Sequence, residues 1–126
     1  MFEKKQPVIK AADLVAGFAA EKSGENIVIM DMSRVSGICD FFVVCSASSV
    51  VRAKTIAENV ELKMKQEGHR VFHREGLKEG KWVLLDFGEI VLHIFQDETR
   101  KRYNLEDLWG DAPRRAYITE PDRRDS

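Results

Sequence analysis

The sequence predicts an α/β fold: a mixed five-stranded sheet with flanking helices. The first observation is the order of the segments, which is helix, two strands, helix, three strands and helix. The second is size, because 126 residues of which 44% are hydrophobic suffice for one core but not for two. We expect one domain over residues 1–115 and a flexible, largely polar tail over 116–126.

The N-terminal third is expected to form a helix and two strands. Pro7 favours the first turn of a helix that runs to about Lys22 and ends before Gly24. Its apolar side carries Ala11, Leu14, Val15, Phe18 and Ala19. Short apolar runs at 26–31 and 40–46 then predict two largely buried strands, the second rich in aromatic and β-branched residues.

A second helix has the strongest pattern in the chain. Ser48 or Ser49 can cap its N-terminus, and Gly68 stops it. Its apolar positions are three or four residues apart: Val50, Ala53, Ala57, Val60 and Met64. The next run, residues 70–75, is more polar and predicts a strand near an edge of the sheet or on a solvated face.

Residues 81–95 contain two runs of strand-forming residues and predict a β-hairpin whose loop is Phe87 and Gly88. The expected cross-strand pairs are Leu85 with Ile90, Leu84 with Val91, Val83 with Leu92 and Trp82 with His93. One hairpin face is then purely aliphatic and needs a cover of helices: Val83, Leu85, Ile90, Leu92 and Ile94. Asp86 and Glu89 would oppose each other at the hairpin end, and a basic partner would relieve their repulsion.

The other hairpin face mixes large apolar groups with two acids and an imidazole: Trp82, Leu84, Asp86, Glu89, Val91, His93 and Phe95. Two interpretations remain open from the residues alone. The face either binds a partner, or it packs under a loop or the C-terminal segment with the acids in water at the turn.

The C-terminal segment is expected to dock on the body of the domain. Asp97 can cap a short helix over 98–103. Leu105, Leu108 and Trp109 then supply apolar side chains for docking. Pro113 is interpreted as the end of ordered packing, and residues from Thr119 on as a loose tail.

Composition argues against several classes of protein. Lys and Arg number 20 against 21 Asp and Glu, so no overall positive field favours direct nucleic-acid binding. Cys39 and Cys45 have no CxxC spacing and suggest a reducing compartment. No apolar run reaches the length of a membrane span, and the start lacks the apolar segment of a secretion signal. We expect a cytoplasmic protein with no membrane contact.

Motifs for catalysis are scarce. The strand-to-helix turn at 45–49 lacks the glycines of a phosphate loop, and the three histidines show no metal-ligand spacing. Asp31, Asp40 and Asp86 lie at strand ends, where carboxylates can hold Mg²⁺ for nucleotidyl transfer. That enzyme is the alternative reading, but a role in capping loops is favoured because the accompanying glycine-serine turn is missing. We therefore expect no enzyme, no metal site and no cofactor.

Several spaced motifs resemble the bacterial ribosomal silencing factor family, also called the RsfS or Iojap family. They are Asp31-Met-Ser33, Cys39-Asp-Phe-Phe-Val-Val44 followed by Ser46 and Ser49, Glu75-Gly76, Trp82-Val-Leu-Leu-Asp-Phe-Gly88, Val91-Leu-His-Ile-Phe95 and Arg102-Tyr-Asn-Leu-Glu-Asp-Leu-Trp109. The resemblance covers residues 8–115 in unbroken order. At 39–41 the chain has Cys-Asp-Phe where the family usually has Ala-Asp-Tyr.

The resemblance implies a fold like a nucleotidyltransferase that has lost its catalytic set. It also implies binding to the large ribosomal subunit through ribosomal protein fourteen, which blocks joining of the small subunit and damps translation under nutrient limitation. Relatives dimerise when free, and organellar relatives carry a transit peptide that is not seen here. A dimerising scaffold with no ribosomal role would also fit composition alone.

The expected partner is basic, and this suits the acidic, aromatic hairpin face. The predicted interface is Trp82, Leu84, Asp86, Glu89, His93 and Phe95, with Glu75 beside them. The segment around Tyr103 and Trp109 is the next candidate if the hairpin face does not bind.

Overall fold

The computed structural model of the chain describes residues 2–118, with side chains from Val8 on. The elements are α1 (Phe2–Glu21), β1 (Glu25–Asp31), β2 (Phe41–Ala47), α2 (Val50–Gln66), β3 (His73–Glu75), β4 (Trp82–Asp86), β5 (Ile90–Gln96), α3 (Asp97–Tyr103), α4 (Leu105–Leu108) and β6 (Arg114–Ala116). The predicted mixed α/β architecture is confirmed, but the sheet has six strands, in the order β3-β4-β5-β2-β1-β6. Strands β2 and β5 are parallel, and the other neighbours are antiparallel.

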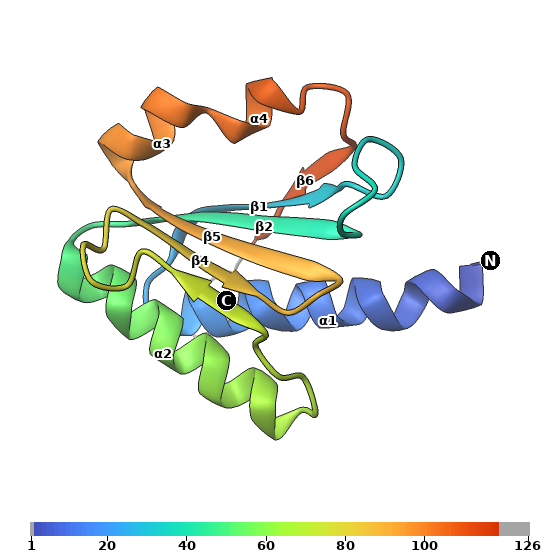
Figure 1. Cartoon of the computed structure of the whole chain (residues 1–126), viewed down its shortest axis with the longest axis horizontal. Helices are drawn as coiled ribbons and strands as arrows, with labels where there is room; N and C mark the ends of the chain where they lie inside the picture. The colour runs from blue at the N-terminus through green and yellow to red at the C-terminus, as the bar shows by residue number, and fades with distance from the viewer. Residues whose placement is uncertain (1, 119–126) are drawn as a thin grey trace, which may run out of the picture.

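Helices cover both faces of the sheet. Figure 1 shows α1 and α2 below it and α3 and α4 above it. The lower core contains the predicted aliphatic hairpin face together with buried residues of α1 and α2. A second, smaller core fills the space between the sheet and the α3–α4 segment, and includes Met30, Val44, Val91, Phe95 and Leu105. Both faces of the central strands are therefore largely withdrawn from water.

The two long helices follow from sequence signals of unequal strength. The side chain of Ser49 caps α2 by accepting a hydrogen bond from the Arg52 amide, and Gly68 follows the helix with a positive φ of 90°. Both predictions for α2 are thus confirmed. The predicted start of the first helix is wrong, because α1 begins at Phe2 and Pro7 lies beyond its first turn. One residue's preference for a first turn does not decide where a helix begins.

The predicted pairing within the hairpin is wrong by two residues, although its faces are right. Trp82 pairs with Phe95 and Leu84 with His93, because the loop is Gly88 and Glu89 and the Phe87 amide donates to the Ile90 carbonyl. Gly88 has a φ of 91°, which suits the first loop position of a tight hairpin. A shift of two residues keeps each side chain on its face. Asp86 consequently lies opposite Val91 and not opposite Glu89.

The edges of the sheet differ from expectation at the C-terminal end. Strand β3 is an exposed edge strand, as its polar residues predicted, but it spans only His73–Glu75. Pro113 does not end the ordered packing, because β6 follows it directly and pairs with β1 at the opposite edge. The side chains of β6 are all exposed, so no apolar pattern could reveal this strand. The boundary at residue 115 stays a prediction, and the tail from Thr119 on lies outside the described residues.

The C-terminal cover consists of two short helices joined by Asn104. Asn104 has a φ of 45°, in the left-handed region, and this turns the chain between α3 and α4. Asp97 is the first residue of α3 and not its cap, because Gln96 occupies that position. Leu105 is buried and Trp109 is half-buried, as predicted for docking, whereas Leu108 is 68% exposed. In the described part of the chain, no helix is long and apolar enough to cross a membrane.

Candidate functional site

A row of aromatic rings crosses the upper face of the sheet beneath α3 and α4. We call this the aromatic row, and its members are Tyr103, Trp82, Phe95, His93, Phe42 and Trp109. Ring centroids lie 4.8 Å apart for Tyr103 and Trp82, 4.9 Å for Trp82 and Phe95, 6.1 Å for Phe95 and His93, 4.5 Å for His93 and Phe42, and 6.5 Å for Phe42 and Trp109. The row joins β4, β5 and β2 to the C-terminal helices, which are far apart in sequence.

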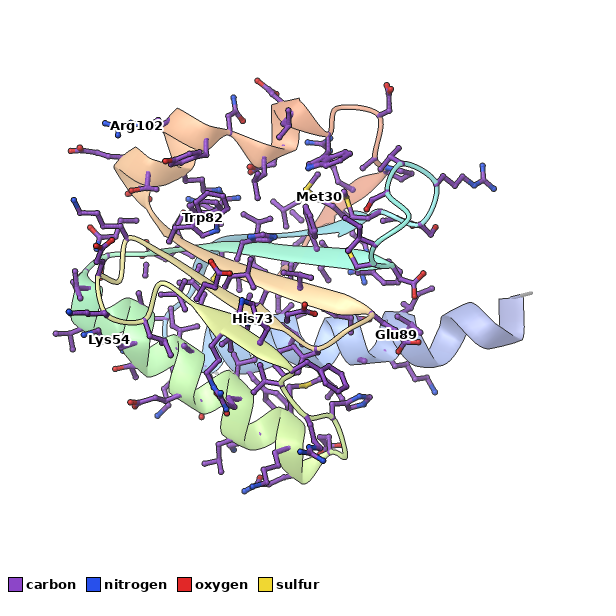
Figure 2. The ribbon with its side chains drawn as sticks, viewed as in Figure 1. Met30, Lys54, His73, Trp82, Glu89 and Arg102 are labelled. Carbon is purple, nitrogen blue, oxygen red and sulfur yellow. The ribbon has the colours of Figure 1, made fainter. Side chains whose placement is uncertain are left out.

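Exposure rises from the middle of the aromatic row toward Tyr103. Phe95 is 0% and His93 is 4% exposed, whereas Trp82 is half-buried and the Tyr103 residue is 50% exposed. Figure 2 shows Trp82 between the sheet and α3. Because Trp82 and Tyr103 are partly open to solvent, their rings can bury further apolar area when another molecule docks.

Acids and apolar groups adjoin this open end on the β3–β4 edge. Glu75 pairs with Leu84, and Leu84 and Asp86 share the face of Trp82 because side chains alternate along a strand. We call Glu75, Trp82, Leu84, Asp86 and Tyr103 the edge patch. All of its members are exposed or half-buried. The edge patch thus offers two aromatic rings, one aliphatic side chain and two carboxylates on one surface.

Backbone geometry fixes the position of the edge patch. Gly76 has a φ of 81°, and a Cβ atom there would overlap the carbonyl oxygen of Trp82. Only glycine therefore permits the close approach of this turn to the first residue of β4. The turn brings β3 back along β4 and sets Glu75 beside Leu84.

The predicted site residues do not all lie in the edge patch. Glu89 is exposed but lies in the hairpin loop, at the far end of β4 from Trp82 (Figure 2). His93 and Phe95 lie on the predicted face but are 4% and 0% exposed, and Phe95 belongs to the same core cluster as Leu105 of α4. The structure therefore brings together Trp82, Leu84, Asp86 and Glu75, and sets Glu89, His93 and Phe95 apart from their surface. That these residues form an interface stays a prediction.

Trp82 and His93 are joined by a hydrogen bond inside the aromatic row. The indole Nε1–H donates to Nδ1 of the imidazole at 3.1 Å. Burial lowers the pKa of His93 to about 4, so the ring is neutral at physiological pH. A neutral ring that accepts at Nδ1 carries its proton on Nε2. That buried nitrogen has no hydrogen-bond partner among residues 2–118.

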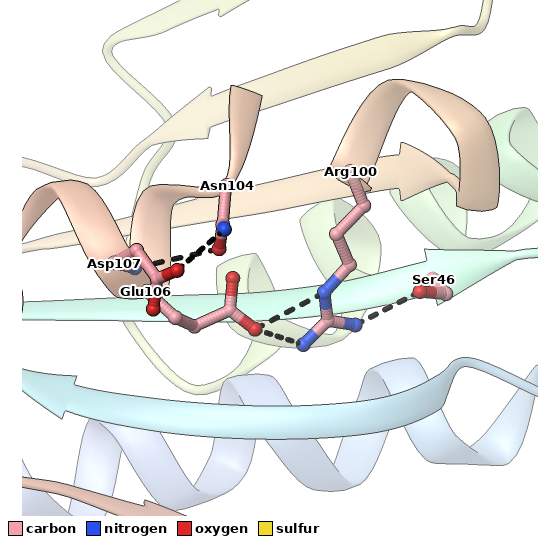
Figure 3. A network of polar contacts seen from close by, with 5 residues as sticks. All are labelled: Ser46, Arg100, Asn104, Glu106 and Asp107. Carbon is pink, nitrogen blue, oxygen red and sulfur yellow. Dashed lines mark hydrogen bonds and ion pairs between the residues drawn. The ribbon is translucent and has the colours of Figure 1, made fainter. Parts of the chain in front are cut away.

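A polar network fastens the C-terminal cover to the sheet (Figure 3). Arg100 of α3 forms an ion pair with Glu106 of α4 at 2.7 Å and donates to the Ser46 hydroxyl of β2 at 2.8 Å. The Arg100 side chain is only 12% exposed. Asn104 adds a hydrogen bond to the carboxylate of Asp107 at 2.7 Å. The network holds α3 over the sheet and so keeps Tyr103 against Trp82.

Sequence reasoning missed this network and the part played by Phe42. Contacts between side chains on β2, α3 and α4 do not occur at any regular spacing in the sequence, so no residue pattern indicates them. The nearest available signal was Arg100 and Glu106, which are opposite charges in the docking segment. A charge pair separated by six residues does not by itself indicate contact, since neighbours on one helix are three or four residues apart.

The strand-end aspartates serve local turns. Asp31 accepts hydrogen bonds from the amide and the hydroxyl of Ser33, and Asp86 accepts one from the Gly88 amide at 2.7 Å. The favoured role in capping loops is confirmed for these two residues. Within residues 2–118, His, Cys, Asp and Glu form no group of three or more that could hold a metal ion.

Comparison with known proteins identifies the family. The family model described as "Ribosomal silencing factor during starvation" (RsfS) matches residues 5–126. This chain belongs to the ribosomal silencing factor family. It is 37% identical over 100 residues to the ribosomal silencing factor RsfS of Bacillus subtilis, covering 79% of this chain and 85% of that protein. It is also 32% identical over 101 residues to the chloroplastic protein Iojap of Zea mays, of which it covers 42% and which matches 78% of this chain.

Two solved structures share the fold over most of this chain. A crystal structure of a Chromobacterium violaceum protein superimposes with a TM-score of 0.79 at 26% identity, covering 93% of this chain and 97% of that one. A Bacillus halodurans structure has a TM-score of 0.71 at 31% identity, covering 82% of this chain and 94% of that one. The resemblance drawn from the spaced motifs is therefore confirmed, and it extends beyond residue 115 into the C-terminal segment.

Proposed function

We propose that this protein binds the large ribosomal subunit through ribosomal protein fourteen and prevents the small subunit from joining, which lowers translation under nutrient limitation. One observation carries the proposal: residues 5–126 match a family described as a ribosomal silencing factor during starvation. The protein acts in the cytoplasm, without a cofactor and with little direct contact to nucleic acid. When it is free of the ribosome, it self-associates as a dimer.

The edge patch is the proposed contact surface. Interface energy usually concentrates in a few aromatic or charged anchors at the centre of a contact, and Trp82 and Tyr103 are partly open aromatic side chains of this kind. Asp86 and Glu75 would face a basic partner, and Glu89 would extend that acidic rim along the hairpin. Such charges speed association and set orientation more than they add affinity. The buried His93 and Phe95 support the surface from beneath.

The protein acts by occupying a surface and not by catalysis. We propose that it has a nucleotidyltransferase-like fold without the catalytic set. Two features favour this view over a magnesium-dependent enzyme: the turn at 45–49 contains no glycine, and the carboxylates of Asp31 and Asp86 accept hydrogen bonds within their own turns. Silencing by exclusion requires only that the bound protein overlaps the position of the small subunit.

Sedimentation of cell extract through a sucrose gradient tests the proposal. The protein should travel with free large subunits, and purified protein added to large subunits should reduce their assembly with small subunits. Trp82→Ala should lose both effects. Val51→Ala is a matched control, because Val51 is a 73% exposed apolar residue on α2, on the opposite side of the sheet. Migration with small subunits, or with neither subunit, would refute the proposal.

A further inference from the structure

His93 retains a polar ring in a position that disfavours one. Its ring contacts the rings of Phe42, Trp82 and Phe95, and its Nε2–H group has no partner among the described residues. A buried donor without an acceptor destabilises a fold, whereas an apolar side chain of similar shape avoids that cost. The hydrogen bond at the other nitrogen, Nδ1, is therefore the feature of this ring that an apolar residue could not supply.

That hydrogen bond acts on the orientation of Trp82. The indole ring lies at the first position of β4, between Phe95 and the half-exposed Tyr103. Contacts with the ring faces of Phe95 and Tyr103 leave a flip of the indole about χ2 open, because this torsion is broad and roughly two-fold. An acceptor 3.1 Å from Nε1 distinguishes the two orientations, because Nε1–H is the indole's only donor. The imidazole thus selects which edge of the indole faces solvent.

We infer that His93 is a positioning residue for ribosome binding, which holds the Trp82 indole in the orientation that the large subunit recognises. This inference rests on the proposed function. In this role His93 acts through Trp82 and does not touch the partner itself. The role fits a residue that is only 4% exposed but is hydrogen-bonded to the partly exposed Trp82. Preorganisation of an aromatic anchor lowers the entropy lost on binding.

A pair of variants separates this role from packing. His93→Asn and His93→Leu branch at the same carbon and are close in size, but only Asn places an acceptor near the position of Nδ1. We expect His93→Leu to bind purified large subunits about tenfold more weakly, the effect of one net hydrogen bond, and His93→Asn to bind within about threefold of wild type. We also expect His93→Leu to be at least as stable as His93→Asn in urea. If His93 served only in packing, the more stable of the two variants would also be the one that binds large subunits more tightly.

The indole proton reports the hydrogen bond directly. In ¹⁵N-labelled protein, the Trp82 signal is identified by its loss in Trp82→Phe. Its exchange with solvent should be slow in wild type and in His93→Asn, and about tenfold faster in His93→Leu. In a Trp82→Phe background, which has no donor, His93→Leu should change binding less than about twofold. If His93→Leu does not fold, His93→Phe is a second variant without an acceptor.

Three results would overturn the inference, and they differ in what they say of the proposed function. If the acceptor-free variant binds like wild type while Trp82→Ala binds weakly, the positioning role fails and the proposed function stands. An unchanged exchange rate of the Trp82 indole proton in that variant has the same meaning. If wild-type protein does not bind large subunits, both proposals fail together.

Discussion

The rings of Trp82 and Tyr103 lie 4.8 Å apart with their planes at 48°, which joins the first residue of β4 to the last residue of α3. Neither side chain is fully buried. The contact therefore links the cover of the upper sheet face to its open edge, and each ring shields part of the other from solvent.

Truncation of either ring should weaken binding to the large subunit. We expect Trp82→Ala to lose about 2 kcal/mol or more of binding free energy, and Tyr103→Ala a similar amount, because truncated aromatic anchors typically cost this much. Binding to purified large subunits is measured beside thermal unfolding. Loss of the fold together with binding would assign Trp82 to the core, whereas wild-type binding by both folded variants would place the interface elsewhere.

Reversal of charge at Asp86 should act mainly on the rate of association. Asp86→Lys should slow binding, and the slowing should diminish as salt is added, because salt screens exposed charges. The carboxylate also accepts a hydrogen bond from the Gly88 amide. Asp86→Asn keeps an acceptor for that amide and is the control for the hairpin turn. Association rates across a salt series would contradict the prediction if the two variants behaved alike.

Removing only one partner of the Arg100–Glu106 ion pair should destabilise the fold. Arg100→Met leaves the Glu106 carboxylate without its ion-pair partner, and we expect a loss of roughly 3 kcal/mol in the free energy of unfolding. The double variant Arg100→Met with Glu106→Leu should recover much of that loss, since neither charge then remains. Urea unfolding of the single and double variants tests this coupling. Equal stability of Arg100→Met and wild type would show that the network does not secure the cover.

The buried imidazole should make the fold sensitive to acid. The pKa of His93 is lowered from 6.5 to about 4 by burial, so the unfolded chain binds more protons than the folded chain between these values. The free energy of unfolding is therefore highest above pH 6.5 and decreases as the pH falls toward 4. From pH 7.5 to pH 5, titration of His93 lowers the free energy of unfolding by about 2 kcal/mol.

His93→Leu removes this titration and should lose less stability over the same interval. His73→Gln is the comparison, because His73 lies on the exposed strand β3 and its removal leaves the buried ring in place. Unfolding free energies at the two pH values would refute the assignment if wild type and His93→Leu lost stability equally.

Nucleotide binding separates a silencing factor from an enzyme of related fold. Titration with nucleotides and Mg²⁺, followed by calorimetry and product analysis, should give no specific heat and no turnover. A micromolar nucleotide affinity that is abolished by Asp86→Asn would reverse the conclusion and favour the magnesium-dependent enzyme.

Sequence patterns predicted the faces of the hairpin better than its pairing. Alternation assigned Val83 to the lower face and Trp82 to the upper face, and both assignments are confirmed. The pairs were wrong because loops at 87–88 and at 88–89 give the same alternation. Strand β6 escaped prediction since its residues are exposed, and its place is set by pairing with β1.

The cover of the upper face could not be decided from the sequence. The residues left two interpretations open, and the structure supports packing for part of this face: Phe95 and His93 are buried, while Trp82 stays half-exposed at the edge. Partner binding by the face stays a prediction. The burial depends on Arg100 meeting Ser46, which lies 54 positions away in the chain. Local periodicity has no access to contacts at such a separation.

The late position of α3 and α4 in the chain has a consequence during synthesis. A nascent chain that ends at Gln96 contains β1 to β5 and both long helices, but its sheet has no cover over Phe42, His93 and Phe95. Such a chain exposes contiguous apolar surface of the kind that aggregates or recruits chaperones. It also lacks Tyr103, so the edge patch is complete only after α3 has been synthesised.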